Sequence, residues 1–553
     1  MMLSPKDHPR IALNTWSKSP MSISGLHDDI IYEVFLLNIT RLHDYSNNSS
    51  LTTTRYTSQV CRSWRTLILN MPSIWGRLLI DDHSLDQKTD HWRDEILRRS
   101  CNSPLWIRWM ICNPHQIIFR RHGTSFFFSV LDKHWDRIQH LSITFLDWEI
   151  ERDRWQPLLR PAPNLRSCSL ISFNLPTPIF ALSELPISPI FSNHAPSLYH
   201  FTTQCFSFSL SAPWISQLRC LHLPRLFSVF SILSALCSTP LLESLTIENV
   251  TTASSTHISV PLPTANLPNL AKFCFKHGEL GPLNDILTHI RPADGYIMRC
   301  SAGVTSNAFT TGHFKACFST LSGAIQRFLL THTVTSFEFS LTSFSFTASA
   351  TTSCGTENFT ITIFNQGVGL FPEDLYHSFP SIVSSCDFAL VKTLSLELHG
   401  PLLSRPTLYF PFFSLFSTVT KLQTGDSTLR ILLDMPPNPE NKTSESIIFP
   451  LLDGLELDHS DEALCDPDLI LEFLWRRKES GKPICQLDIG LLEDWVEDHN
   501  MNASLEELTG MEVIWGNNRH KEFSYVCGLG QPDRIFVVPG SDDEFDSSGE
   551  EGY

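Results

Sequence analysis

A short apolar pattern recurs along most of this 553-residue chain and limits its fold more than any other feature does. In each copy, an apolar residue is followed by two variable residues, a second apolar residue, one variable residue and a third apolar residue. Clear copies begin at Ile138, Leu165, Leu218, Leu242, Leu270, Val334, Val391, Leu452, Ile484 and Leu508, and weaker copies begin at Leu198 and Val419. Where neighbouring copies are clear, they start roughly 20–33 residues apart, a period typical of solenoid repeats; the intervals on either side of Val334 are longer. The pattern therefore predicts one short strand in each repeat.

A proline precedes several copies at a constant distance. Pro163, Pro196, Pro240, Pro268 and Pro450 each stand two residues before the first apolar residue of a copy. A proline at this position ends the preceding segment and leaves the hydrogen-bond donors of the strand intact. This spacing favours a solenoid, in which stacked neighbours bury what one repeat cannot bury alone. Chance matches in an all-β protein rich in Leu and Phe are the alternative interpretation.

We predict an α/β chain whose residues 105–515 form a degenerate leucine-rich-repeat-like solenoid. The asparagine that such repeats carry after the strand is missing, since Leu226 and Val250 occupy its place in two copies. Residues 301–380 are the least regular part, and we expect irregular strands or an inserted loop there. Between Phe339 and Phe344 the apolar spacing shifts by one residue, which predicts a bulge.

Charge is distributed unevenly along the chain, whose net charge is −17. Residues 1–450 hold 33 acidic and 34 basic residues, whereas residues 451–553 hold 25 acidic and 7 basic residues. A neutral body with an acidic C-terminal part argues against nucleic acid as a partner. Residues 516–553 are expected to form a C-terminal segment that ends in an acidic disordered tail.

The composition also bears on the compartment of the protein. No apolar run reaches the roughly 18 residues that span a bilayer. Residues 1–20, which we expect to be a disordered tail, lack the apolar core of a secretion signal. We therefore expect a soluble protein of the cytoplasm or the nucleus, with no membrane partner. The 15 cysteines include no CxxC pair, and we expect most of them to be small, buried apolar residues.

Motifs for catalysis, cofactors or metals are weak or incomplete. The zinc-like spacings lack a second pair of ligands, the glycine pairs lack the rest of a phosphate-binding loop, and the adjacent carboxylates are expected on a solvated face. These candidates are Cys112–His115, Cys274–His277, the glycine pairs at 367–369 and 528–530, and Glu506–Glu507. We predict no catalytic residue, no cofactor and no metal site, and hence a binding protein rather than an enzyme.

The N-terminal part has the periodicity of helices. Apolar residues at three- and four-residue spacing predict a helix over 26–37 and a second helix over 58–69, which ends before Pro72. The polar segment between them is expected to be a loop. A third helix is expected over 91–99, within a linker of residues 83–104.

Residues 21–82 resemble an F-box, the helical module by which substrate receptors bind the Skp-type adaptor of cullin–RING ubiquitin ligases. The opening leucine, acidic residue and aliphatic run of that family are matched by residues 26–35, Leu-His-Asp-Asp-Ile-Ile-Tyr-Glu-Val-Phe. The Val-Cys-Arg-x-Trp-Arg core is matched by residues 60–65, and the closing proline and tryptophan by residues 70–75. Fungal members often continue with Leu-x-Arg-Ser and Pro-Leu, as residues 97–105 do here.

The resemblance implies a non-catalytic receptor that binds a Skp-type adaptor and its cullin scaffold through the helices, and an unknown protein substrate through the repeats. So many apolar side chains on a short module are typical of a partner site, with packing against the first repeats as the alternative. We expect Trp64 and Trp75 to lie mainly in the module core. The candidate adaptor-binding residues are Leu26, Ile30, Val34, Phe35, Val60 and Trp64.

Two departures from the family pattern leave a second hypothesis open. His27 stands where the family usually has proline, and the polar loop from Arg41 to Ser58 is somewhat long. The second hypothesis is an interaction scaffold whose helical module has lost adaptor binding.

Overall fold

The structure of the chain is a computed structural model. It describes residues 26–39, 50–80, 91–110, 121–145, 152–172, 189–204, 208–224, 227–251, 261–304, 311–353, 355, 358–366, 371, 378–399, 409–435, 447–457, 466–491, 499–516 and 522–537. Two compact units are formed. Unit 1 consists of Met1–Ile179 and Pro186–Ser197, and unit 2 of Phe180–Leu185 and Leu198–Tyr553.

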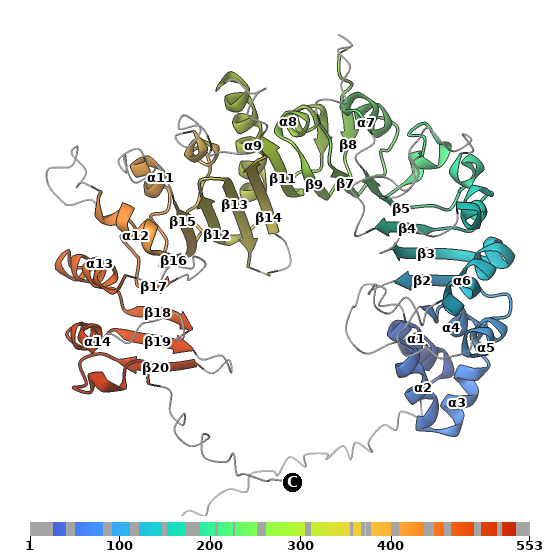
Figure 1. Cartoon of the computed structure of the whole chain (residues 1–553), viewed down its shortest axis with the longest axis horizontal. Helices are drawn as coiled ribbons and strands as arrows, with labels where there is room; N and C mark the ends of the chain where they lie inside the picture. Colours follow the sequence, from blue (N-terminus) through green and yellow to red (C-terminus); the bar gives the residue numbers. More distant parts are fainter. Residues whose placement is uncertain are drawn as a thin grey trace, which may run out of the picture. The chain divides into compact units, whose positions relative to one another are not determined.

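Unit 1 begins with helices and continues into a parallel sheet whose strands pair in the order β1-β2-β3-β4 (Figure 1). Its strands are β1 (Leu79–Ile80), β2 (Leu105–Met110), β3 (Ile138–Phe145) and β4 (Ser167–Ser172). Its helices and 3-10 turns are α1 (Asp28–Ile39), α2 (Ser50–Val60), α3 (Arg62–Leu69), α4 (Pro72–Gly76), α5 (His91–Arg99), α6 (Arg121–His134), η4 (Trp135–Arg137), η5 (Arg152–Leu159) and η6 (Ile190–Asn193).

Unit 2 contains a long, mostly parallel sheet. Its strands are β5 (His200–Thr203), β6 (Cys220–Leu223), β7 (Ser244–Glu248), β9 (Lys272–Glu279), β11 (Ile297–Val304), β12 (Val334–Leu341), β13 (Ser345–Thr352), β14 (Asn358–Asn365), β15 (Thr393–Leu398), β16 (Lys421–Thr424), β17 (Gly454–Leu457), β18 (Gln486–Leu491), β19 (Glu512–Gly516) and β20 (Glu522–Val526). They pair in the order β5-β6-β7-β9-β11-β14-β13-β12-β15-β16-β17-β18-β19-β20. The short strands β8 (Ala265–Leu267) and β10 (Ile290–Pro292) form a separate parallel pair.

Helices cover one face of the unit 2 sheet and leave the other face, here called the inner face, uncovered by helices in the described part of the unit (Figure 1). The covering segments are α7 (Val229–Leu236), α8 (Leu280–His289), α9 (Thr311–Thr331), α11 (Phe410–Ser414), α12 (Asp426–Leu433), α13 (Pro467–Glu479) and α14 (His499–Glu506), with the 3-10 turns η7 (Pro213–Gln217), η9 (Phe379–Ile382) and η13 (Pro532–Arg534). This α/β arrangement is consistent with a repeat solenoid.

The strands predicted from the apolar pattern are confirmed. Each of the twelve copies falls on a strand or directly before one, from β3 to β19, and the apolar residues that define the copies are at most 6% exposed. The sheet also continues past residue 515, the predicted end of the repeats, because β20 pairs antiparallel with β19. The pattern missed β11, whose first three buried alternate positions carry Met298, Cys300 and Ala302 in place of branched apolar residues.

The recurring proline occupies a tight turn before four of the strands. The first apolar residue of a copy donates its N–H to the carbonyl three residues earlier, at Leu165 to Ala162 (3.3 Å), Leu242 to Thr239 (3.2 Å), Leu270 to Leu267 (3.0 Å) and Leu452 to Phe449 (3.1 Å). The proline is the second residue of these turns, where its fixed φ is favourable and its missing N–H costs nothing. The same bond forms without a proline at Val391 and Phe388 (3.0 Å).

Polar side chains in these turns join neighbouring repeats. The residue after the proline, or its equivalent, donates to a main-chain carbonyl of the preceding repeat: Asn164 to Asp136 (2.7 Å), Ser197 to Pro163 (3.0 Å), Asn269 to Pro240 (2.9 Å) and Thr418 to Val391 (3.1 Å). The repeats lack the asparagine that is expected after the strand. Polar side chains before the strand instead donate to carbonyls of the neighbouring turns.

Residues 301–380 contain an inserted antiparallel meander. Strands β12, β13 and β14 follow one another as hairpins, and they lie between β11 and β15 in the sheet (Figure 1). The shift of one residue between Phe339 and Phe344 comes from a hairpin turn. In this turn, Thr342 Oγ1 accepts the N–H groups of Phe344 (3.2 Å) and Ser345 (3.0 Å). The prediction of a bulge there is corrected: the irregular register lies at the start of β12, between Val334 and Ser336.

The cysteines are less uniform than predicted. Of the eleven in the described residues, five are buried, and the other six are exposed or half-buried. Burial raises the pKa of Cys386 to about 12 and that of Cys317 to about 11, so these thiols stay neutral.

None of the helices in the described ranges combines the length and the apolar character that crossing a bilayer requires.

Candidate functional site

The N-terminal helices α1 to α4 form a small packed module, here called the helical module (residues 26–80). Phe35 of α1 packs edge to face on Trp64 of α3, with ring centroids 5.4 Å apart. The indole N–H of Trp75 donates to the carbonyl of Ile68 (2.9 Å), and the Arg99 guanidinium lies 4.6 Å from the Trp75 ring. As predicted, Trp75 lies in the core, at 4% exposed.

The structure corrects the predicted boundaries of the helices. Residues 50–57, predicted to belong to a loop, form most of α2, and the predicted helix over 58–69 is divided at Cys61. Cys61 has an extended backbone, and its Sγ accepts the N–H of Trp64 (3.4 Å), so it caps α3. The Ser- and Thr-rich α2 has little intrinsic helix propensity, and the burial of Leu51 and Thr54 supports it.

Apolar side chains of the module remain exposed on two helices. On α1 and directly before it, Leu26, Ile30 and Val34 are 38%, 51% and 47% exposed, at four-residue spacing along one face. On α2, Tyr56 and Val60 are 69% and 64% exposed, also four residues apart. Four of the six candidate adaptor-binding residues, Leu26, Ile30, Val34 and Val60, are therefore available to a partner.

The remaining two candidates belong to the interior or to its edge. Phe35 is only 4% exposed and Trp64 is half-buried, because they pack on each other between α1 and α3. The expectation that Phe35 faces a partner is corrected, since this side chain supports the exposed residues from beneath. The sequence pattern missed Tyr56, because a residue in a segment interpreted as a loop has no predicted face.

His27 holds the start of α1. Its carbonyl accepts the N–H groups of Ile30 (3.0 Å) and Ile31 (3.2 Å), and its Nδ1 lies 3.3 Å from the main-chain nitrogen of Asp29. A histidine can thus serve as the residue that caps the helix, where the F-box family usually has proline. The first turn of α1 is therefore hydrogen-bonded even though His27 differs from the usual proline.

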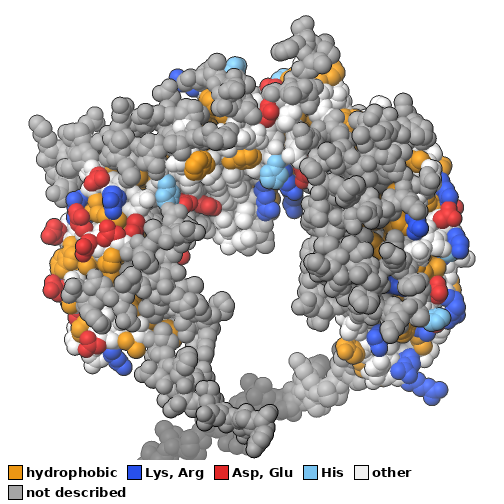
Figure 2. Space-filling view, viewed as in Figure 1, with side chains coloured by type: hydrophobic (Ala, Val, Ile, Leu, Met, Phe, Trp, Pro, Cys, Tyr) orange, Lys and Arg blue, Asp and Glu red, His pale blue; other side chains and the backbone are white. Residues whose placement is uncertain are grey.

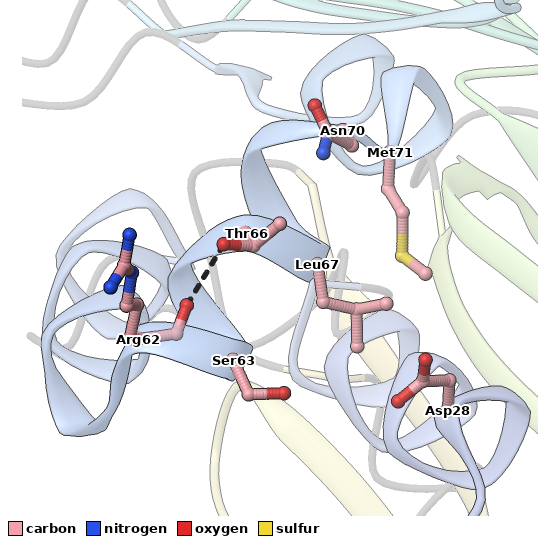
Figure 3. A pocket seen from close by; sticks show the side chains of 7 residues that line it. All are labelled: Asp28, Arg62, Ser63, Thr66, Leu67, Asn70 and Met71. Carbon is pink, nitrogen blue, oxygen red and sulfur yellow. Dashed lines mark hydrogen bonds between the residues drawn. The ribbon is translucent and has the colours of Figure 1, made fainter.

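A groove of 490 Å³ lies between the start of α1 and the helix α3 (Figure 3). Leu67 and Met71 supply apolar surface, and Asp28 and Arg62 add one negative and one positive charge. The remaining lining is polar, with Ser63, Thr66 and Asn70. Because the groove adjoins the helix that carries Ile30 and Val34, it can accept side chains of a partner that covers α1.

The inner face of unit 2 is polar and holds a buried network of charges. Glu248 of β7 accepts from the Gln204 side chain (2.9 Å), and its carboxylate lies 3.2 Å from His222 Nε2 and 3.3 Å from Lys276 Nζ. Burial raises the pKa of Glu248, but the nearby His222, the hydrogen bond from Gln204 and the charge of Lys276 outweigh it and lower the pKa to about 2. The carboxylate therefore stays ionised and holds β5, β6, β7 and β9 together at this end.

The chemical motifs that we considered gain a structural explanation where they are described. Gly528 (φ 92°) and Gly530 (φ 78°) form a turn after β20 in which the Gly530 N–H and the Tyr525 hydroxyl donate to the Glu506 carboxylate. Glu506 thus supports a turn and does not lie on a purely solvated face, and the glycines take a backbone conformation that other residues disfavour. Residues 112–115 and 367–369 lie outside the described residues. In the described ranges, no three His, Cys, Asp or Glu side chains converge to hold a metal ion.

Comparison with known proteins adds little to this picture. No protein-family model matches the chain, and no curated protein matches it. Among solved structures, the leucine-rich repeat-containing protein LegL7 from Legionella pneumophila is similar over 69% of this chain and 92% of its own, at 14% identity and a TM-score of 0.27. A likeness of this size carries no argument about function.

Proposed function

We propose that the chain is a substrate receptor of a cullin–RING ubiquitin ligase. In this proposal, the helical module is an F-box that binds a Skp-type adaptor, and the sheet of unit 2 is a degenerate leucine-rich-repeat-like solenoid that binds a protein substrate. The chain itself would perform no chemistry, and ubiquitin would be transferred by its partners.

The observation that carries the proposal is the exposed apolar stripe of Leu26, Ile30 and Val34. A surface stripe on a small module that already has a packed core points to a protein partner. Covering one aliphatic side chain contributes up to about 1.5–3 kcal/mol, so three of them supply a sizeable part of a stable interface. The F-box resemblance of residues 26–35 and 60–65 supports a Skp-type adaptor as that partner.

Capture of a co-expressed Skp-type adaptor tests the proposal. We expect the native chain to retain the adaptor, and Ile30→Asp or Val34→Asp to reduce capture at least tenfold, because each places a charge in an apolar interface. Both positions are exposed, so the variants keep the module core intact. Leu330→Asp is the matched control, since Leu330 is 76% exposed on α9 in the other unit.

Two results would contradict the receptor function. Equal capture by all four proteins would show that the stripe on α1 is not the contact. A native chain that folds but captures no adaptor would favour the interaction scaffold, in which the helical module has lost adaptor binding. In that case, recovery of capture by His27→Pro would identify His27 as the cause.

A further inference from the structure

Exposed cations gather at one place on the inner face of unit 2. Lys272 and Lys276 lie on β9 and Arg299 lies on β11, and all three side chains are exposed. These residues are here called the basic patch. Figure 2 shows Lys and Arg side chains beside His side chains over β9 and β11.

The register of the two strands brings the three cations close together. Arg299 pairs with Cys274, which lies midway between Lys272 and Lys276 along β9. Alternate residues of a strand share a face and are about 6.6 Å apart, and neighbouring strands are about 4.8 Å apart. The Cα atom of Arg299 is therefore about 8 Å from that of either lysine. This separation is near the spacing of successive same-face side chains in an extended peptide.

A bulge presents one of these lysines. The register between β9 and β11 shifts so that two residues of β9, Lys276 and His277, oppose the single Ser301 of β11. His277 has a positive φ of 54°, which redirects the strand at this point. Bulges of this kind re-aim side chains at binding surfaces.

Most of the positive charge of the patch is not neutralised within the described residues. Lys276 lies 3.3 Å from the Glu248 carboxylate, whereas Lys272 and Arg299 have no carboxylate within ion-pair distance in that part of the chain. Three cations and one carboxylate leave a net charge of +2. In contrast, Lys421 on β16 lies 2.6 Å from Glu456 on β17 and is neutralised.

The two strands next to the patch carry hydroxyl groups in the same row. Thr360 of β14 lies beside Arg299 in register, followed by Ser349 of β13, whose hydroxyl lies 3.3 Å from that of Thr360. The next residue in this row is the exposed Glu338 of β12. Hydroxyl groups donate hydrogen bonds to carboxylates without adding charge. A ligand with carboxylates thus meets two cations that have no ion-pair partner among the described residues, and two hydroxyl groups on the neighbouring strands.

We propose that the basic patch of Lys272, Lys276 and Arg299 binds a carboxylate-rich segment of a partner protein. This inference rests on the proposed function of the inner face as the surface that binds the recruited protein. Charge complementarity favours such a segment, because the patch is a local excess of cations in a chain of net charge −17. A long polyanion such as a nucleic acid is disfavoured, since Glu397, Glu456 and Asp488 line the inner face farther along the sheet.

Binding of a fluorescent peptide of about ten glutamates to the full-length protein tests the inference. We expect measurable binding that weakens between about 50 and about 300 mM salt, because the attraction is screened. The double variant Lys272→Glu/Arg299→Glu should lose at least tenfold in affinity. The matched control is Lys315→Glu/Lys482→Glu, which changes the net charge equally at exposed lysines outside the inner face and should change affinity less than twofold.

Several outcomes would overturn the inference. Unchanged binding by the double variant, or equal binding of a neutral Gly-Ser peptide, would remove the basic patch as the site. A single strand of about twenty thymidines that binds tightly, and only when Lys272 and Arg299 are present, would assign the patch to nucleic acid. If the glutamate peptide binds only after the acidic residues of 542–551 are replaced by Asn and Gln, the occupant is the chain's own tail.

Adaptor capture by the same double variant separates this inference from the proposed function. The basic patch belongs to unit 2 and the apolar stripe of α1 to unit 1. Loss of peptide binding with unchanged adaptor capture supports both proposals. Loss of peptide binding in a chain that captures no adaptor supports the basic patch and contradicts the receptor function.

Discussion

Strands β15, β16 and β17 and strands β12, β13 and β14 belong to the same sheet, but they join it in different ways. In the first group, each strand runs parallel to its neighbour, and the chain passes through a helix before the next strand begins. In the second group, hairpin turns reverse the chain, and β13 is antiparallel to both of its neighbours. The difference teaches that the solenoid tolerates an inserted meander.

The insertion is tolerated because the buried face continues through it. Phe337 and Phe339 of β12 pair in register with Leu394 and Leu396 of β15, so the apolar rows of the repeats run on into the meander. Phe339 also packs on Phe412 of α11, with ring centroids 4.4 Å apart. The buried side of the sheet is thus one continuous apolar layer, whatever the direction of the strands.

The largest expected effect comes from breaking this shared layer. Phe339→Ala should destabilise the protein by about 3–5 kcal/mol, because Phe339 is fully buried and contacts both Phe346 of the meander and Phe412 of the next repeat. Urea unfolding measures the loss. The control is Phe344→Ala in the hairpin turn, where the side chain is 57% exposed and we expect a change within about 0.5 kcal/mol. Equal effects at the two positions would show that the layer is not continuous.

A smaller effect is expected in the parallel region, where charges of neighbouring repeats meet. Glu248→Gln should cost about 1–2 kcal/mol at pH 7, because it removes a buried carboxylate bound to His222 and Lys276. The pKa of Glu248 in the folded state, about 2, lies below its ordinary value of 4.5. Its stabilisation is therefore present above pH 4.5 and is lost as the pH falls toward 2.

Thermal unfolding of native and Glu248→Gln protein across this pH range checks the prediction. The difference in stability should shrink as the pH falls from about 4.5 to about 2. Glu243→Gln is the matched control, because Glu243 pairs with Arg219 at the surface (2.6 Å) and should contribute at most about 0.5 kcal/mol. A constant difference at every pH would show that the Glu248 charge does not stabilise the fold.

The smallest expected effect tests the turn that makes the meander possible. Thr342→Val should cost about 1 kcal/mol, because it removes the hydroxyl that accepts the N–H groups of Phe344 and Ser345. Thr342→Ser keeps the hydroxyl and should leave stability nearly unchanged. If Val and Ser have the same effect in urea unfolding, the hydroxyl does not hold the turn.

Local pattern was sufficient to predict most strands of the repeats but few features of the insertion. Leu394, Leu422 and Leu455 lie on strands whose apolar residues all face the same buried layer, so the pattern is visible within a few residues. Strand β13 buries Ala348 and Ala350, which carry little apolar signal. The buried residues of β14 are strongly apolar, but they recur at every second position and so do not match the repeat pattern. The helix α2 was missed because its support comes from contacts and not from propensity.

The candidate surfaces, too, could be predicted only in part from local pattern. The helical spacing of Leu26, Ile30 and Val34 was enough to place them on one face, but burial separated them from Phe35 only after α3 was packed on α1. The basic patch could not be predicted, because Arg299 lies on a strand that the pattern missed. Arg299 and Lys272 are distant in the sequence, and only the pairing of β9 with β11 brings them together.

What the sequence by itself determined is the repeating unit: the strands, the turns with proline that precede them and the apolar residues that they bury. These features depend on contacts and backbone preferences within a few residues, so they can be read locally. The tertiary structure alone decided which strands became neighbours, where the meander was inserted and which charges came together. Those outcomes depend on pairing between distant segments, which no local pattern contains.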